Sequence, residues 1–119
     1  MRYFAILLIA AASACSQQPR TFRDAEAAVR SVLRDPESAR FSDAQQCGKA
    51  DGVVGQVNAK NGFGGYAGSA SYVYFGGQAA VEGSDSDQYV QLMKRCTEAI
   101  RQETSAIQAR TAKTLSETK

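Results

Sequence analysis

The stretch that decides the fold reads YAGSASYVYFGGQAAVE and spans residues 66–82. Side chains alternate along residues 66–75, and one face of this segment carries Tyr66, Tyr72 and Tyr74. Alternation with a period of two is typical of a β-strand. The glycine pair that follows at 76–77 favours a turn, and residues 78–82 then predict a short fourth strand.

Two further strands are expected before this hairpin. The first carries three small or apolar residues on one face, Ala39, Phe41 and Cys47. The second alternates through Val53, Val57 and Ala59. The Asn61-Gly62 pair and the glycines after it favour a turn, because glycine adopts backbone angles that other residues avoid. Residues 39–82 therefore predict an antiparallel sheet of three or four strands.

Helical periodicity flanks this sheet on both sides. Residues 21–35 carry an apolar stripe behind Thr21, which we expect to be the N-cap. Pro36 ends that helix and opens a single new turn. Residues 84–110 predict a second helix, with an apolar face from Tyr89 to Ile107. The fold class is therefore α+β, with an N-terminal helix, the sheet and a C-terminal helix.

The first fifteen residues, MRYFAILLIAAASAC, have the features of a secretory signal. Arg2 precedes an apolar stretch that is too short to span a bilayer permanently, and small residues then run directly into Cys15. A cysteine at that point resembles the lipobox of bacterial lipoproteins, in which it is acylated and becomes the mature N-terminus. The same small residues also fit an ordinary signal peptidase site, which would release a soluble protein.

These features divide the chain into four parts: a lipoprotein signal peptide (1–14), a short tether (15–20), a single α+β domain (21–110) and a frayed polar tail (111–119). The expected location is the cell envelope, with a lipid anchor in the membrane. Ser16 favours the periplasmic face of the outer membrane if the source is Gram-negative. A soluble secreted or periplasmic protein is the alternative.

The cysteine count agrees with an envelope protein. If Cys15 carries lipid, Cys47 and Cys96 remain, and an oxidising compartment favours one disulfide between them. Such a bridge closes a loop of about fifty residues and contributes roughly 4 kcal/mol to the free energy of unfolding. Two free thiols are the alternative.

Two segments of the chain resemble a known group of proteins. Residues 35–41 read DPESARF, and residues 55–68 read GQVNAKNGFGGYAG. Together they resemble a widespread group of small secreted or lipidated bacterial proteins of unknown function. Where such relatives often have a cysteine, just before the glycine that opens the second segment, this chain has Val54. The resemblance implies a periplasmic or surface location, and it implies no activity, substrate or catalytic residue.

The glycine-rich segment and the strand after it supply the candidate binding surface: Asn58, Lys60, Asn61, Tyr66, Tyr72 and Tyr74. One cation and two amides are suited to a carboxylate, a sugar or a peptide backbone. Alternatively, the asparagines support the turn and the tyrosines pack under a helix. Because the two helices are expected to cover only one face of the sheet, the other semi-apolar face is surplus. This surplus face is the main physical reason to expect a partner.

Several classes of site are disfavoured by composition and spacing. The chain has no histidine, which excludes Ser-His and Cys-His nucleophile systems and histidine zinc sites. Ala67 stands where a nucleotide-binding G-x-G-x-x-G loop needs glycine. Asp85 and Asp87 fit helix capping better than calcium binding. After loss of Arg2, 13 basic residues face 12 acidic ones, which gives no reason to expect nucleic acid as a partner.

The sequence therefore predicts a non-enzymatic interaction module with no catalytic residue, metal or cofactor. Its partners would be the membrane, through the lipid, and an envelope protein or the cell wall. The alternative is a small cell-wall-acting enzyme that uses paired carboxylates. The candidate pairs for that alternative are Glu37 with Asp43 and Glu82 with Asp85.

Overall fold

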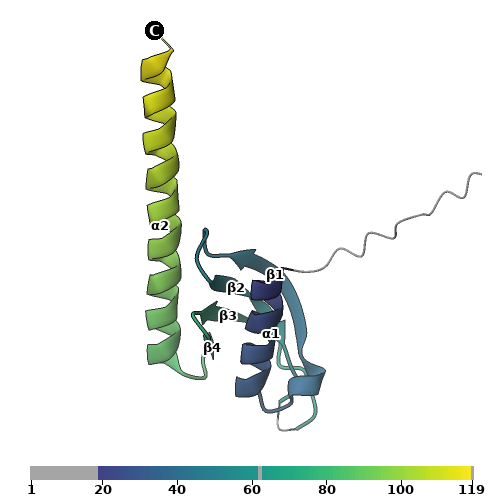
Figure 1. The fold of residues 1–119 in the computed structure, drawn as a ribbon. Coiled ribbons are helices and arrows are strands. Elements are labelled where there is room, and N and C mark those ends of the chain that lie inside the picture. Colours follow the sequence, from purple (N-terminus) through teal and green to yellow (C-terminus); the bar gives the residue numbers. More distant parts are fainter. Residues whose placement is uncertain (1–18, 62, 119) are drawn as a thin grey trace, which may run out of the picture.

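The computed structural model describes residues 19–61 and 63–118. Their elements, in chain order, are α1 (Arg20–Val32), η1 (Pro36–Ser38), β1 (Arg40–Gln46), β2 (Gly52–Asn58), β3 (Ala70–Phe75), β4 (Gln78–Val81) and α2 (Ser86–Glu117). This order confirms the predicted α+β fold, including the single turn at Pro36 (Figure 1). The predicted signal peptide and Cys15 lie outside the described residues. No helix in the described part of the chain has the length and apolar character needed to cross a membrane.

The strands form one antiparallel sheet in the order β1-β2-β3-β4. A register shift in β1 falls between Ser42 and Gln45, and Asp43 has a positive φ of 55° there. This irregularity breaks the alternation along β1, so Phe41 and Cys47 join the cores on opposite sides of the sheet. The prediction that these two residues share a face was therefore wrong.

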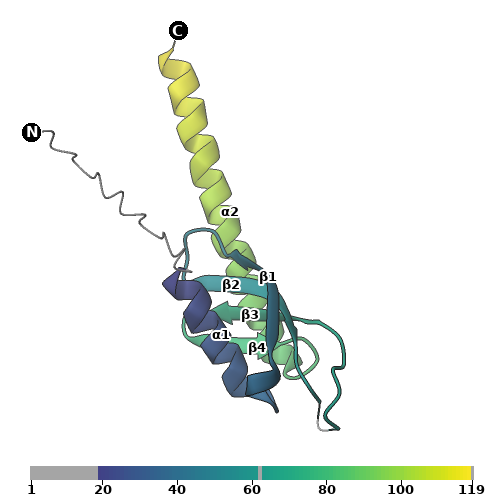
Figure 2. The same ribbon diagram turned by 90° about the vertical axis from the view of Figure 1, so that its right-hand side faces the viewer.

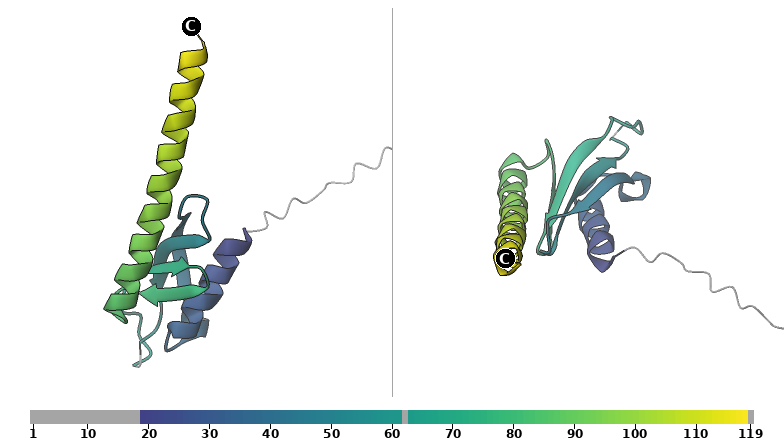
Figure 3. Two further views of the ribbon diagram at one scale, coloured as in Figure 1. Left: turned by 60° about the vertical axis from the view of Figure 1, so that its left-hand side comes forward. Right: turned by 90° about the horizontal axis from the view of Figure 1, so that it is seen from above.

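One helix packs on each face of the sheet, α1 against all four strands and α2 against β3 and β4, and the view from above in Figure 3 shows the sheet between the two helices. Tyr72 and Tyr74 face α1, whereas Val73 faces α2. The expectation of a surplus sheet face was wrong. Because β3 is apolar on both sides, a helix on each side removes more apolar surface from water than two helices on one side.

The core beneath α1 depends on a glycine in the neighbouring strand. Gly55 lies opposite Tyr72 in the register, and a Cβ at Gly55 would come within 2.7 Å of the Tyr72 Oη. The Tyr72 and Phe41 rings also pack nearly perpendicular to each other, with 5.6 Å between centroids. From α1, Ala25 and Val29 pack into this cluster and are fully buried. The absence of a side chain at Gly55 therefore leaves the space that Tyr72, the largest fully buried side chain, occupies.

The start of α1 differs from the prediction. The helix begins at Arg20, with Pro19 in the N-cap position and no side-chain cap. The carbonyl of Pro19 accepts the N–H of Phe22 at 3.0 Å. The prediction of Thr21 as N-cap was wrong because the restricted backbone of Pro19 already leads into the first turn.

The core beneath α2 contains the predicted disulfide. Cys47 and Cys96 are bonded, 49 residues apart in sequence, and both are buried. The bridge ties the loop between β1 and β2 to the middle of α2. Leu92 packs beside it, and Asp85 caps the helix by accepting the N–H of Gln88 at 3.0 Å. The disulfide and the capping role of Asp85 are thus confirmed.

The helix α2 continues to Glu117, well past Arg110. The expected frayed tail was therefore wrong for residues 111–117, since no proline or glycine interrupts this segment and Lys113 lies 3.9 Å from Glu117 on the next turn. Every side chain from 104 to 117 is exposed. We call residues 104–117 the arm. Figures 1 and 2 show it projecting past the sheet.

Candidate interaction surfaces

The two segments that carry the family resemblance meet at Ser38. The backbone N–H of Lys60 donates to Ser38 Oγ at 2.9 Å, and the Tyr66 hydroxyl donates to the Ser38 carbonyl at 3.2 Å. Lys60 and Tyr66 also form an isolated antiparallel bridge. Residues 60 and 66 therefore come together, as their place in the predicted surface requires, and Ser38 is the group that joins them.

Two cations flank the Tyr66 ring. The Arg40 guanidinium carbon lies 4.3 Å from the ring centroid, and Lys60 Nζ lies at 5.9 Å. The face of an aromatic ring attracts positive charge, so these contacts fix the ring against the strand ends. The predicted start of a strand at Tyr66 was wrong, because the glycine-rich segment forms a loop in which Gly64 and Gly68 have positive φ.

The two asparagines of the predicted surface, Asn58 and Asn61, direct their side-chain oxygens into the structure. Asn61 Oδ1 accepts the N–H groups of Phe63, at 2.9 Å, and Gly65, at 3.3 Å, which makes it the support of the turn. Phe63 stands fully exposed at the tip of the loop. Asn58 lies at the end of β2, and its Oδ1 is buried without a hydrogen-bond partner among the described residues. The amide oxygen of Asn61 is therefore already occupied within the loop.

Tyr72 and Tyr74 do not belong to a surface. They are 1% and 5% exposed and pack under α1, so the prediction of a tyrosine contact face was wrong for both. Burial raises the pKa of Tyr72, and the negative charge of Glu26 adds to the effect. Burial likewise raises the pKa of Tyr74. Their role is packing, because α1 covers the face on which they lie.

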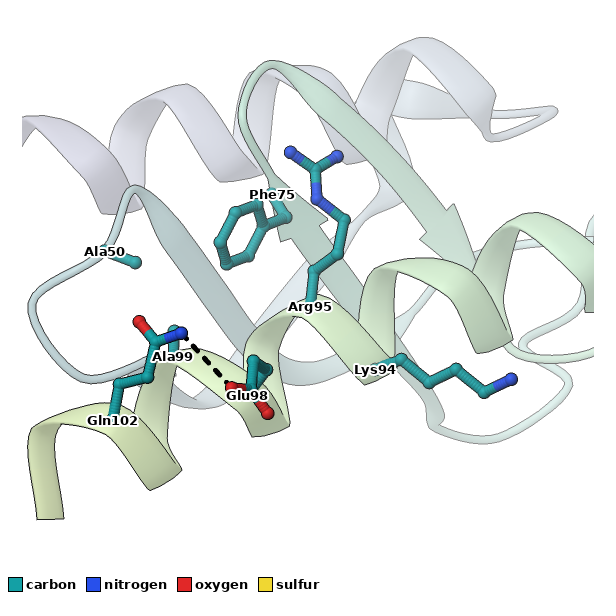
Figure 4. A pocket seen from close by; sticks show the side chains of 7 residues that line it. All are labelled: Ala50, Phe75, Lys94, Arg95, Glu98, Ala99 and Gln102. Carbon is teal, nitrogen blue, oxygen red and sulfur yellow. Dashed lines mark hydrogen bonds between the residues drawn. The ribbon is translucent and has the colours of Figure 1, made fainter. Parts of the chain in front are cut away.

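Figure 4 shows a pocket beside α2, with a volume of about 440 Å³. The Arg95 guanidinium stacks on the Phe75 ring at 4.6 Å and forms part of its wall. Gln102 donates to Glu98 at 3.2 Å, and a hydrogen bond from Arg101 lowers the pKa of Glu98. Glu98 and Gln102, on the helix side of this pocket, are thus paired with each other.

A second pocket, of about 250 Å³, lies between the end of α1, the end of β2 and the glycine-rich loop. Its wall is largely apolar, and Arg34 and Lys60 are the cations on it. Neither carboxylate pair of the enzyme alternative lines these two pockets. Asp43 lines a third pocket, beside Tyr89 and Met93, and its proposed partner Glu37 is not part of that wall.

The sequence interpretation missed a surface on α2. Side chains at alternating spacings of three and four residues form one stripe along this helix: Val90, Met93, Thr97, Ile100, Thr104, Ile107, Thr111 and Thr114. Val90, Ile100 and Ile107 are 48%, 44% and 54% exposed. A 3-4 spacing that persists over several turns is typical of a helix that pairs with another helix. We call these eight residues the α2 stripe.

A signal for the α2 stripe was present in the sequence. The threonines at 97, 104 and 111 are seven residues apart, and Met93, Ile100 and Ile107 repeat with the same interval. Because threonine is not counted as apolar, only Met93, Ile100 and Ile107 of this repeat were noticed, and they were assigned to the same face as the residues that pack on the sheet. No protein-family model, curated protein or solved structure matches this chain. The functional argument therefore rests on these surfaces and on the sequence.

Proposed function

We propose that the protein is a bacterial envelope lipoprotein, anchored through Cys15, whose α+β domain is a non-enzymatic interaction module. The arm and the α2 stripe form its binding element. The observation that carries this proposal is the contrast between a sheet with a helix packed on each face and a helix whose residues from 104 to 117 are all exposed. An envelope protein that presents a helix is the class of partner that fits the stripe.

The location is supported by two independent features. The first fifteen residues combine a signal peptide pattern with a cysteine at the cleavage point. The Cys47–Cys96 disulfide is of a kind that persists in oxidising compartments and is rare in the cytosol. In a chain anchored at Cys15, only a few residues separate the lipid from α1, about 17 Å at full extension. The domain would therefore lie close to the bilayer.

The energetics of the arm support a binding role. An isolated helix of the arm's length is marginal in water, and most helical stability in proteins comes from packing one face. Every residue of the arm is exposed, although Ala106, Ile107 and Arg110 line a pocket with Lys49 and Ala50 of the β1–β2 loop. Thr104, Thr111 and Thr114 also have low helix propensity. A partner on the α2 stripe would remove this apolar surface from water and add the missing packing.

The lipid anchor is tested by the mass of the protein extracted from membranes. We expect cleavage before Cys15 and a diacylglyceryl or triacyl mass at that residue. A Cys15→Ser variant should lose the acyl mass and leave the membrane fraction. Unprocessed chain in the cytosol, with Cys47 and Cys96 reduced, would contradict the proposal.

The binding element is tested by a photo-reactive amino acid placed at single positions in cells that express the protein. Ile107 lies on the α2 stripe, and Ala109 is an exposed position on the opposite side of the same turn. We expect a discrete covalent adduct from position 107 and none from the matched control at 109. Equal adducts at both positions, or none at 107, would contradict binding through the stripe.

A further inference from the structure

We infer that the arm pairs with a second copy of the same chain, with the two α2 helices antiparallel. This inference rests on the proposed function, because it names the partner of the α2 stripe. It is carried by three observations on α2: the 3-4 repeat, the internal bonding of its threonines and the charges that border it. The repeat provides a continuous surface, and the other two observations bear on the two requirements that a two-helix interface must meet.

The first requirement is that the buried positions carry no unpaired polar group. The hydroxyls of Thr104 and Thr111 donate to the carbonyls four residues earlier, each at 3.0 Å. Thr114 makes the same bond to Arg110 at 3.0 Å. Since these donors are already satisfied, covering the threonines leaves none of their hydroxyl protons unpaired. Three of the four threonines in the α2 stripe can therefore be buried without an unpaired hydroxyl proton.

The second requirement is charge complementarity along the borders of the stripe. One border carries Glu103, Arg110 and Glu117 after the buried Cys96, and the other carries Lys94, Arg101, Gln108 and Leu115. In an antiparallel pair of helices, each border faces the same border of the second helix. Neither Glu103 nor Arg110 makes an ion pair within the described residues. Their charges are therefore not neutralised by an ion pair within the described residues, and the Glu103 carboxylate also borders the loop at Gly48.

One antiparallel register satisfies these charges. With Thr104 opposite Ile107 of the second copy, Glu103 lies beside Arg110 of the second copy, and two-fold symmetry repeats the pair. The same register sets Ile100 opposite Thr111 of the second copy, so each isoleucine meets a threonine. Arg101 then faces an uncharged residue, Gln108 of the second copy.

The neighbouring registers are disfavoured. A shift by one heptad toward longer overlap sets Glu103 against Glu103 and Arg101 against Arg101 of the second copy. The opposite shift sets Arg110 against Arg110. A parallel pair brings Thr97, Thr104 and Thr111 each against its own copy, and no opposite charges meet across its borders. Like charges that face each other are destabilising, so charge selects the antiparallel register.

A closed two-fold pair also uses the same patch on both copies, as most homodimers do. The stripe is rich in threonine, so the pairing is expected to be weak in dilute solution. Two copies anchored in one membrane have a high effective concentration, which compensates for a modest intrinsic affinity.

The test uses the mature chain, residues 15–119, with Cys15→Ser to keep it in solution. Sedimentation equilibrium should show a monomer–dimer equilibrium. Ile107→Asp should weaken dimerisation at least tenfold, because it buries a charge in the interface. Ala109→Asp is the matched control, with the same new side chain on the opposite side of the arm, and should leave the dissociation constant within about twofold. Circular dichroism and an intact Cys47–Cys96 bond establish that each variant is folded.

The register is tested by charge reversal. Glu103→Arg alone and Arg110→Glu alone should each weaken the dimer by about tenfold at low salt. The double variant, Glu103→Arg with Arg110→Glu, should restore it. Positions 103 and 110 are two turns apart on one helix and do not contact each other there, so recovery of the dimer affinity would show that the two residues meet between copies.

Three results would overturn the inference: a monomer at every concentration up to about 1 mM, a dimer insensitive to Ile107→Asp, or no recovery in the double variant. The first would leave the proposed function standing if position 107 still forms an adduct with another protein in cells. Loss of that adduct, together with a monomeric chain, would remove both. The two proposals are therefore separable.

Discussion

The two halves of α2 form one continuous helix and carry one stripe, yet their surroundings differ. The half that lies on the sheet buries Leu92 and Cys96 and includes the disulfide. The arm, residues 104–117, has every side chain exposed. Helical geometry is therefore shared, whereas tertiary stabilisation is confined to the first half. The proposed binding role rests on this extension of α2 beyond its own core.

The largest expected effect is loss of the disulfide, which stabilises only the packed half. The double variant Cys47→Ala with Cys96→Ala should lower the free energy of unfolding by roughly 4 kcal/mol, because a loop of this length is no longer closed in the unfolded chain. Urea denaturation of the oxidised parent and the variant measures the difference. A change below about 1 kcal/mol would show that the bridge contributes little to holding α2 on the sheet.

A second comparison sets one apolar residue from each half against the other. Leu92→Ala should cost about 3 kcal/mol, because it leaves a cavity between α2 and the sheet. Ile107→Ala should change the free energy of unfolding of the monomer by less than about 0.5 kcal/mol. Both values come from urea denaturation at concentrations where the chain is monomeric. Equal costs would mean that the arm packs on the domain in solution.

Glycine substitutions sharpen the comparison further. Ala99→Gly lies where α2 meets the loop at Gly48, and it should cost about 1 kcal/mol of global stability. Ala109→Gly should leave global stability nearly unchanged, since the arm can unfold locally, but should reduce the helical signal in circular dichroism. If both variants lost the same global stability, α2 would be a single cooperative unit.

The smallest effect concerns pH. Because burial raises the pKa of Tyr72 and of Tyr74, the folded chain keeps those protons above pH 10, where the unfolded chain has lost them. Their contribution to stability is therefore complete below about pH 10 and is lost as the pH rises further. Tyr72→Phe should reduce this alkaline loss and change stability at pH 7 by at most about 1 kcal/mol, since the Tyr72 hydroxyl has no hydrogen-bond partner among the described residues.

Denaturant midpoints measured from pH 7 to pH 11 test this behaviour for the parent and the Tyr72→Phe variant. The arm carries no tyrosine, so its helical signal should not follow the same titration. An alkaline transition that is unchanged in the variant would contradict the assignment to Tyr72.

Much of the fold could be predicted from the sequence, because local patterns determine it. Alternation identified β3, the glycine pair at 76–77 identified the hairpin, and Pro36 identified the turn η1. The first helix was expected to run to residue 35, but it ends at Val32, three residues earlier. The pairing of Cys47 with Cys96 was expected on the condition that Cys15 carries the lipid, and the structure contains this bond. The side of the sheet on which each helix packs could not be predicted, since it depends on relative burial across the whole sheet. The bulge near Asp43 likewise left no sequence pattern.

The candidate surface was predicted less well. Lys60 and Tyr66 do come together, but through Ser38, whose role is a tertiary contact that spacing does not reveal. Tyr72 and Tyr74 belong to the core because tyrosine fits both a surface and a buried site. The α2 stripe was missed because helix patterns were judged by apolar residues alone. The hydrogen bonds from the threonine hydroxyls to helix carbonyls, which make these side chains suitable for burial, are visible only in the structure.

The central claim is that the arm is a binding element whose partner is a second copy of the chain. Amide hydrogen exchange of the mature chain, measured residue by residue at low and at high protein concentration, tests it most directly. The account predicts that amides in the arm exchange rapidly when the chain is monomeric and gain protection as the concentration rises, while amides around Leu92 and Cys96 stay protected throughout. Rapid exchange in the arm at every concentration, or equal protection of both halves in the monomer, would contradict it.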